Sequence, residues 1–186
     1  MSAIVLNAIR TALTEYLPDR MDTPAARLMM LAIQKQEDPE ERRYQVVKRT
    51  EATAKENIVG PKTAKGPARS LWQMEIGGGV NGVLSHHNTG PLIIPICHRL
   101  ELNATPRDCW AAIEQNDVLA ACFARLLLWS DPKPLPKITD AEGAFDLYLR
   151  TWRPGAYMNG FTEQRQSLRA KFMKNYEASL KELNIQ

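Results

Sequence analysis

Apolar side chains recur every three or four residues along most of the chain, which is the spacing of one face of an α-helix. This spacing predicts helices near the N-terminus, after Pro24, after residue 80, after Pro106, over 118–129, up to Trp152 and from about Thr162. The stretch 92–100 fits a helix or a strand, and we favour a helix. The expected fold class is all-α and mainly helical, with an α+β fold carrying minor strands as the alternative.

The helix that Thr23 caps and Pro24 begins carries an acid on its apolar face. Three or four residues separate successive members of the series Ala26, Met30, Ile33 and Glu37. Apolar neighbours and the negative end of the helix dipole both favour a protonated carboxyl group at Glu37. Cleavage of a glycosidic bond needs such an acid, because the leaving oxygen must receive a proton. Glu37 is therefore a candidate general acid, and the alternative is a solvated acid at a helix end.

The segment between residues 38 and 79 is less regular. Asp38 can cap a second helix with Pro39 at its first position. Periodicity is weak over 44–58, and 57–65 has the composition of a loop. We expect a short helix over 68–75, which a glycine triplet would end.

The second half of the chain contains the strongest core signal. The stretch 118–129 is apolar on every side, and Arg125 is its only charge. It should be the central buried helix, capped by Asn116 or Asp117, because it is too short to cross a bilayer. Three prolines predict a loop over 130–137 before a helix that begins with a capping box.

Composition limits the classes of function. A chain of 186 residues with a formal charge of +3 is most simply one domain, and no basic patch interleaved with aromatic residues indicates nucleic-acid binding. Arg10 and Glu15 interrupt the first apolar stretch, so it does not read as a signal peptide. The three cysteines, which form no CxxC pair, are Cys97, Cys109 and Cys122. They indicate neither a disulfide framework nor a zinc site, and no motif predicts a cofactor.

A metal site is a separate hypothesis. Its candidate ligands are His86, His87, Cys97 and His98. Adjacent histidines point in different directions on most backbones, and no pair of histidines has the i, i+4 spacing of a helical site. We therefore favour packing or surface roles for these residues and predict no metal.

Two short runs carry a resemblance to a known family. The run 32–37 (Ala-Ile-Gln-Lys-Gln-Glu) resembles the helix that bears the catalytic glutamate of lysozyme-like lytic transglycosylases. The run 68–73 (Ala-Arg-Ser-Leu-Trp-Gln) is similar to their second motif, which lines the glycan groove. More closely, the chain resembles small bacteriophage and prophage proteins with a lysozyme-like pattern. This resemblance implies a lysozyme-like domain over 1–156 and a C-terminal amphipathic helix over 157–186 that packs on the domain or on a partner subunit.

The resemblance assigns roles to particular residues. Glu37 matches the general acid, and Gln73 matches the groove glutamine that contacts sugar near the scissile bond. Trp72 would flank the groove, and Glu75 would face the cleft or solvent. Tyr148 is a candidate for a third family motif, which contains a tyrosine. A second candidate for that motif is the run 157–160 (Tyr-Met-Asn-Gly).

Two positions depart from the family pattern. Asp38 stands where serine usually follows the acid, and Ser70 stands where glycine precedes the leucine. A single glutamate can protonate the leaving oxygen and then remove a proton from the sugar's own hydroxyl, which gives an anhydro product. A two-carboxylate mechanism would need a second acid, for which Glu51, Glu56 and Glu75 are candidates. We favour the single acid.

The resemblance implies a virion-associated phage protein that is made in the host cytoplasm without a signal peptide. It would cleave peptidoglycan between N-acetylmuramic acid and N-acetylglucosamine at the cell wall or in the periplasm, during genome delivery. Its partners would be peptidoglycan, other virion proteins and further copies of itself in the particle. The alternative is a structural tail, neck or internal ejection protein that has the same fold and little or no catalytic activity.

Overall fold

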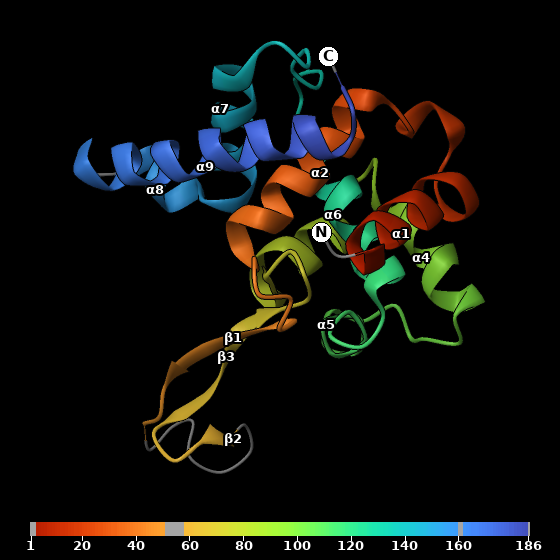
Figure 1. The fold of residues 1–186 in the computed structure, drawn as a ribbon. Coiled ribbons are helices and arrows are strands. Elements are labelled where there is room, and N and C mark those ends of the chain that lie inside the picture. The colour runs from red at the N-terminus through yellow and green to blue at the C-terminus, as the bar shows by residue number, and fades with distance from the viewer. Residues whose placement is uncertain (1–2, 51–57, 160–161, 186) are drawn as a thin grey trace.

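Helix α6 (Asp117–Trp129) lies in the middle of the structure, as its apolar sequence predicts (Figure 1). This computed structural model describes residues 3–50, 58–159 and 162–185. The other helices are α1 (Ala3–Thr11), α2 (Pro24–Glu37), α3 (Asn81–Ser85), α4 (Gly90–Arg99), α5 (Pro106–Ala112), α7 (Ala141–Trp152), α8 (Pro154–Asn159) and α9 (Thr162–Glu182). The strands are β1 (Tyr44–Lys48), β2 (Ile58–Gly60), β3 (Thr63–Arg69) and β4 (Met74–Glu75). The fold is thus mainly helical, with a small four-stranded antiparallel sheet, and is α+β-like.

Side-chain caps begin several helices where the sequence predicts them. The hydroxyl of Thr23 accepts a hydrogen bond from the Ala26 N–H at 3.1 Å, and Asn116 caps α6 in the same way. The capping box predicted for α7, formed by Thr139 and Glu142, is wrong by one residue, because Asp140 is the cap and accepts the N–H of Gly143. The stretch 92–100 is helical as expected, within α4.

The predicted second helix after Asp38 is wrong. The carboxylate of Asp38 does accept backbone N–H groups, from Arg42 at 3.1 Å and from Arg43 at 2.8 Å. Glu41 and Arg43, however, have positive φ angles of 54° and 63°, which a continuing right-handed helix excludes. Asp38 therefore closes a turn, and the chain leaves it as strand β1.

The weakly periodic stretch 44–58 and the loop predicted over 57–65 contain β1, β2 and the start of β3. β3 pairs with β1 and with β2, both antiparallel, and its last two residues pair with β4. Arg43, just before β1, forms a two-pronged ion pair with Asp117, with nitrogen–oxygen distances of 2.8 and 2.7 Å. This ion pair fixes the base of the sheet to the start of α6.

The predicted short helix over 68–75 is also wrong, because a tight turn joins β3 to β4. Ser70 and Gln73 have φ angles of 72° and 50°, in the left-handed region. The N–H of Gln73 donates to the Ser70 carbonyl at 3.1 Å, which closes the turn. The glycine triplet does not end a helix but lies in a π-helical turn over 76–80 that precedes α3.

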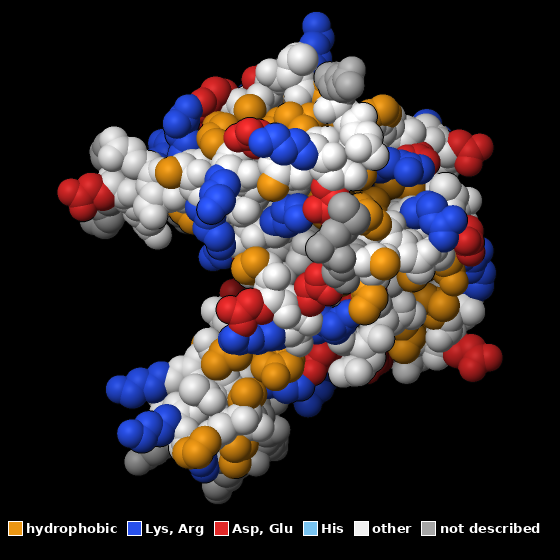
Figure 2. Space-filling view, in the orientation of Figure 1, with side chains coloured by type: hydrophobic (Ala, Val, Ile, Leu, Met, Phe, Trp, Pro, Cys, Tyr) orange, Lys and Arg blue, Asp and Glu red, His pale blue; other side chains and the backbone are white. Residues whose placement is uncertain are grey.

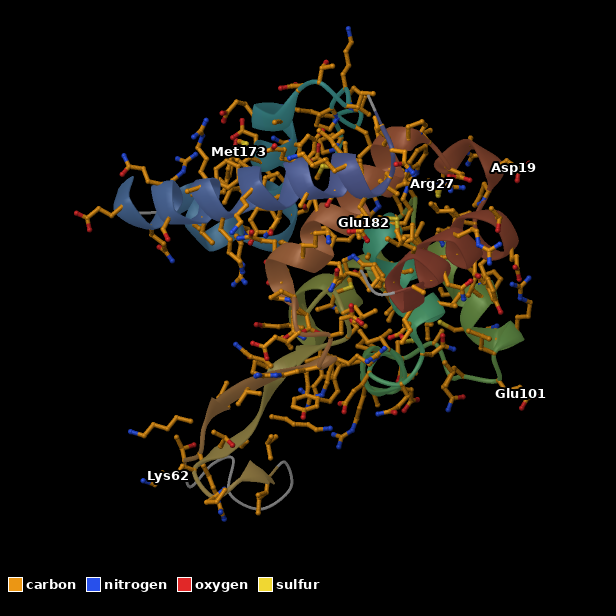
Figure 3. All side chains as sticks on the ribbon, in the orientation of Figure 1. Asp19, Arg27, Lys62, Glu101, Met173 and Glu182 are labelled. Atoms are coloured by element: carbon orange, nitrogen blue, oxygen red, sulfur yellow. The ribbon has the colours of Figure 1, made fainter. Side chains whose placement is uncertain are left out.

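Strands β1, β2 and β3 form an arm that projects from the helical body (Figures 1 and 2). Lys62 lies at its far end (Figure 3), and Val46, Ile58 and Val59 are exposed along it. In the part of the chain that the structure describes, no helix is both long and apolar enough to cross a membrane.

Helix α9 packs across α2 and α7 of the same chain (Figure 1). Phe172 and Tyr176 are buried on this contact, and the Phe172 ring stacks on Tyr148 with centroids 5.1 Å apart. Glu182, near the end of α9, pairs with Lys35 of α2 at 2.8 Å (Figure 3). The contact between α9 and α2 therefore combines a buried aromatic face with an ion pair at its edge.

Two buried thiols lie close enough to be joined by oxidation. The sulfur atoms of Cys97 in α4 and Cys109 in α5 are 3.5 Å apart, and the hydrogen bond from Cys109 lowers the pKa of the Cys97 thiol. Diamide removes two hydrogens from such a pair, and the resulting disulfide is expected to raise the free energy of unfolding by up to about 3 kcal/mol. Alkylation of the denatured, unreduced protein followed by peptide mapping should then label Cys122 alone. Recovery of alkylated Cys97 and Cys109 after diamide treatment would contradict this expectation.

Candidate functional site

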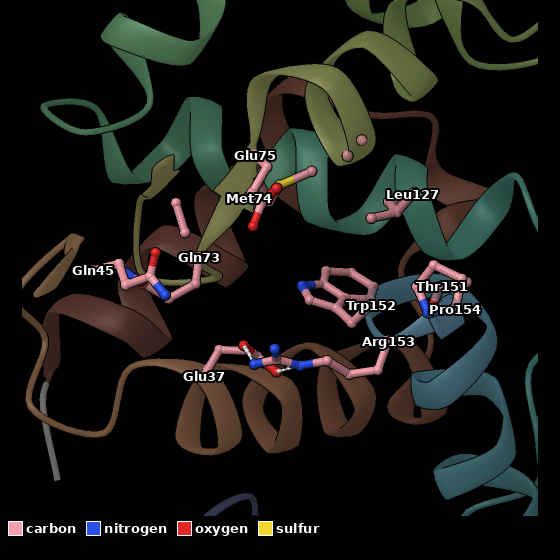
Figure 4. Close-up of a pocket in the computed structure, with 13 residues that line it drawn as sticks. Glu37, Gln45, Gln73, Met74, Glu75, Leu127, Thr151, Trp152, Arg153 and Pro154 are labelled. Carbon is pink, nitrogen blue, oxygen red and sulfur yellow. Dashed lines mark hydrogen bonds and ion pairs between the residues drawn. The ribbon is translucent and has the colours of Figure 1, made fainter. Parts of the chain in front are cut away.

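A cavity of about 480 Å³ opens between the end of α2, the β3–β4 turn, α6 and the end of α7. Figure 4 shows its polar walls, with Glu37 on one side and Glu75 across from it. The side chains of Gln45, Gln73 and Trp152 lie between these two carboxylates around the rim. A concave site with a few converging polar groups and an aromatic wall is typical of a ligand-binding cavity.

Glu37 is held by two side chains from the end of α7. The Tyr148 hydroxyl donates to its Oε1 at 2.6 Å, and Arg153 contacts both carboxylate oxygens, at 2.5 Å from Nη2 and 3.2 Å from Nε. The Glu37 side chain is only 4% exposed, whereas that of Arg153 is 48% exposed. The sequence predicts apolar surroundings for this acid, whereas the structure places a cation and a phenol against it. In this structure the two donors hold and orient the carboxylate.

Both partners of Glu37 stay in their protonated forms. Burial raises the pKa of the Tyr148 phenol, and the negative charge of Glu37 raises it further. Burial opposes the charge of Arg153, but the neighbouring Glu37 outweighs that effect and raises the Arg153 pKa above its ordinary value. Tyr148 is therefore a hydrogen-bond donor and Arg153 a cation over the whole physiological pH range.

Gln73 and Glu75, two of the predicted substrate-binding residues, line the same cavity as Glu37. The Gln73 amide donates to the Ser70 carbonyl at 2.8 Å, which orients the side chain at the cavity wall. The backbone of Gln73 is in the left-handed region, and the residue directly precedes strand β4. Glu75 is exposed on β4.

Trp72 does not reach the cavity. Its side chain is fully buried, and its indole N–H donates to the Met30 carbonyl of α2 at 2.8 Å. The aromatic wall belongs instead to Trp152, whose indole N–H donates to the Trp72 carbonyl at 2.9 Å. The expectation that Trp72 flanks a groove is therefore wrong, since the turn at Ser70 directs this side chain into the core.

Gln45, Trp152 and Arg153 are among the residues of this cavity that the sequence did not predict as site residues. Gln45 lies on β1, a strand that weak periodicity concealed. The apolar spacing of the helix that ends at Trp152 predicts a packing role for this side chain. Arg153 directly follows α7 and precedes Pro154. An arginine at the end of a helix that carries a candidate tyrosine is the sequence signal that could have predicted this site residue.

The remaining candidates lie elsewhere. The His86 and His87 rings are 4.4 Å apart, and Cys97 is buried against Cys109. Over the described ranges, no three His, Cys, Asp or Glu side chains gather where they could hold a metal ion. Tyr157 is 39% exposed. Glu51, Glu56 and Gly160 fall outside the residues that the structure describes.

Comparison with protein-family models, with curated proteins and with solved structures gives no match to this chain.

Proposed function

We propose that this protein is a virion-associated phage enzyme with a lysozyme-like fold that cleaves the glycan strand of peptidoglycan at the cavity beside Glu37. The bond would be the one between N-acetylmuramic acid and N-acetylglucosamine. The observation that carries the proposal is that Glu37, Gln73 and Glu75 line one cavity, and that Tyr148, which is buried behind the cavity wall, holds the acid. The family resemblance selected these same residues.

The backbone at Ser70 also supports the proposal. The family motif has glycine at this position, and Ser70 adopts a φ of 72°, a conformation that glycine takes without strain. The Ser70 hydroxyl accepts the Trp72 N–H at 3.2 Å, a bond that suits serine in this turn. The departure from the motif at Ser70 therefore keeps the turn that a glycine would form.

The chemistry would begin when a glycan enters the cavity and displaces the half-exposed guanidinium of Arg153 from Glu37. With the guanidinium displaced, the carboxyl group of Glu37 would be free to act as the general acid and donate a proton to the glycosidic oxygen. The carboxylate that remains would then accept a proton from the sugar's own hydroxyl, which closes an anhydro ring. In this mechanism Trp152 would pack on a sugar face, and Gln73 would hydrogen-bond a sugar substituent.

The rival proposal is a structural virion protein with the same fold. The resting ion pair between Glu37 and Arg153 favours it, because Arg153 contacts both oxygens that a glycan would have to reach. The packing of α9 on α2 does not support the structural role. The apolar face of α9 contacts its own chain, so this face is not open to a partner subunit.

Product analysis separates these proposals. Purified protein is incubated with peptidoglycan sacculi, and soluble muropeptides are identified by mass spectrometry, with heat-denatured protein as the control. Anhydro-muropeptides are the expected product. Hydrated reducing ends would instead indicate hydrolysis, with Glu75 as the second carboxylate to test, and the absence of soluble products would favour the structural role.

The Arg153→Gln variant is expected to have a lower KM for glycan than the wild type. The glycan no longer has to displace a guanidinium that contacts both oxygens of Glu37, so KM should fall by about threefold to tenfold. The measurement is the initial rate of cleavage over a range of sacculus concentrations. Arg169→Gln, which breaks the exposed ion pair with Glu142, is the matched control. An unchanged or higher KM would contradict the role given to Arg153.

A further inference from the structure

A second cavity, of about 660 Å³, lies beside the loop that joins α6 to α7. It shares no lining residue with the cavity at Glu37. Four of its lining side chains are cationic, namely Arg20, Arg125, Lys133 and Lys137. Such an excess of positive charge around a concave surface attracts anions.

Arg125 is the unusual member of this set. It is 1% exposed, and its Nε donates to the Met21 carbonyl at 3.0 Å, but no residue of the described chain accepts a hydrogen bond from its Nη1. Burial lowers its pKa to about 10, so the guanidinium still carries its charge at neutral pH. A buried cation with an unpaired donor is costly, and an oxyanion is the group that matches its geometry.

The acid that lines this cavity forms its ion pair with a residue other than Arg125. Asp131 also lines the cavity, but its carboxylate pairs with Arg150 at 2.9 Å. The Trp129 ring faces Arg125 at 5.2 Å and Arg20 at 5.9 Å, which holds both guanidinium groups at the cavity wall. The positive charge of the cavity is therefore left for a ligand.

The other walls are apolar and stiff. Prolines at 132, 134 and 136 fix the backbone of the loop, and Leu128 and Leu135 complete the surface. An inorganic anion would leave these walls uncovered. An anion attached to an apolar body would cover them.

We propose that this cavity binds a small organic anion, whose carboxylate or phosphate group pairs with Arg125 and whose apolar body packs against the proline loop. The site is separate from the glycan cavity, so it would equip the protein to respond to a second ligand. Lys133 and Arg20, which are exposed at the rim, would draw the anion in and keep it there.

Titration calorimetry and thermal unfolding at constant ionic strength test this proposal. The probes are benzoate, phenyl phosphate and inorganic phosphate, and the uncharged benzamide is the control. Saturable heat and a rise in Tm are expected with benzoate or phenyl phosphate, and whichever binds more tightly identifies the preferred head group. Binding of inorganic phosphate alone, equal binding of benzamide, or no binding of any probe would overturn the proposal.

Variants locate the site. Arg125→Met is expected to weaken the better probe by about tenfold or more. If that variant does not fold, the double variant Arg20→Gln/Lys133→Gln, which changes only exposed side chains, should still weaken it by about threefold to tenfold. Lys174→Gln, on the exposed face of α9, is the matched control for lost charge. Equal affinity in the double variant and the wild type would overturn the assignment of this cavity.

Discussion

Replacing Glu37 by glutamine is expected to lower the rate of glycan cleavage by about 10²–10⁴-fold, because the amide cannot donate the proton that the leaving oxygen needs. Glutamine has nearly the same shape, so Tyr148 can still donate to its side-chain oxygen at the position now occupied by Oε1. The assay is the release of soluble muropeptides from sacculi. Binding of the glycan should persist while turnover is lost.

Two comparisons make the Glu37→Gln result specific. Glu142→Gln removes an exposed carboxylate that pairs with Arg169, and it should cleave at the wild-type rate. Glu75→Gln tests the second acid, and under the single-acid mechanism it should reduce cleavage far less than Glu37→Gln. Wild-type cleavage by Glu37→Gln would remove the assignment of the general acid.

Replacing Trp72 by alanine is expected to lower the free energy of unfolding by about 3–5 kcal/mol, which is the usual loss for a large aromatic side chain in a core. The indole is fully buried, and its removal also deletes the hydrogen bond that it donates to the Met30 carbonyl. Denaturation in urea, followed by circular dichroism, measures the change. Trp72→Phe keeps most of the volume, so it should lose about 1–3 kcal/mol through the missing hydrogen bond.

Substitutions of Trp72 should change mainly the stability of the fold, whereas substitutions of Trp152 should change mainly the affinity for glycan. Trp152 lines the cavity, so Trp152→Phe should weaken glycan binding more than Trp72→Phe does when both variants are folded. If the Trp72→Ala protein had wild-type stability but had lost its affinity for glycan, the result would contradict the burial of Trp72 and would support a place for this side chain in the groove.

The helical part of the fold could be predicted because local signals specify it. Thr23 and Pro24 define the start of α2, and the all-round apolar character of 118–129 defines the central helix. These signals act within a few residues, and a sequence displays them directly.

The sheet could not be predicted in the same way. In β1 the two faces are similarly open to solvent, so its residues show no apolar and polar alternation. Its order comes instead from pairing with β3 and from the ion pair between Arg43 and Asp117, 74 residues away. The predicted short helix over 68–75 was wrong for a similar reason. Ser70 has a positive φ, which the residue types in this stretch do not indicate.

The candidate site was predictable where a motif marks it and not where distant segments meet. Glu37 and Gln73 came from short runs, and they do line one cavity. Arg153, the strongest electrostatic partner of Glu37, is 116 residues away in sequence, and its contact depends on how α7 packs on α2. The prediction for Trp72 was wrong because it assumed a helix over 68–75, whereas this stretch forms a turn.

The contact between Glu37 and Arg153 also bears on the order of folding during synthesis. The ribosome completes α2 more than a hundred residues before it delivers the arginine, so the acid spends most of translation without its two donors. Closing so long a loop is entropically costly and comes late. The cavity is thus assembled only when α7 docks, and a nascent or truncated chain that lacks α7 has neither Tyr148 nor Arg153 to hold Glu37.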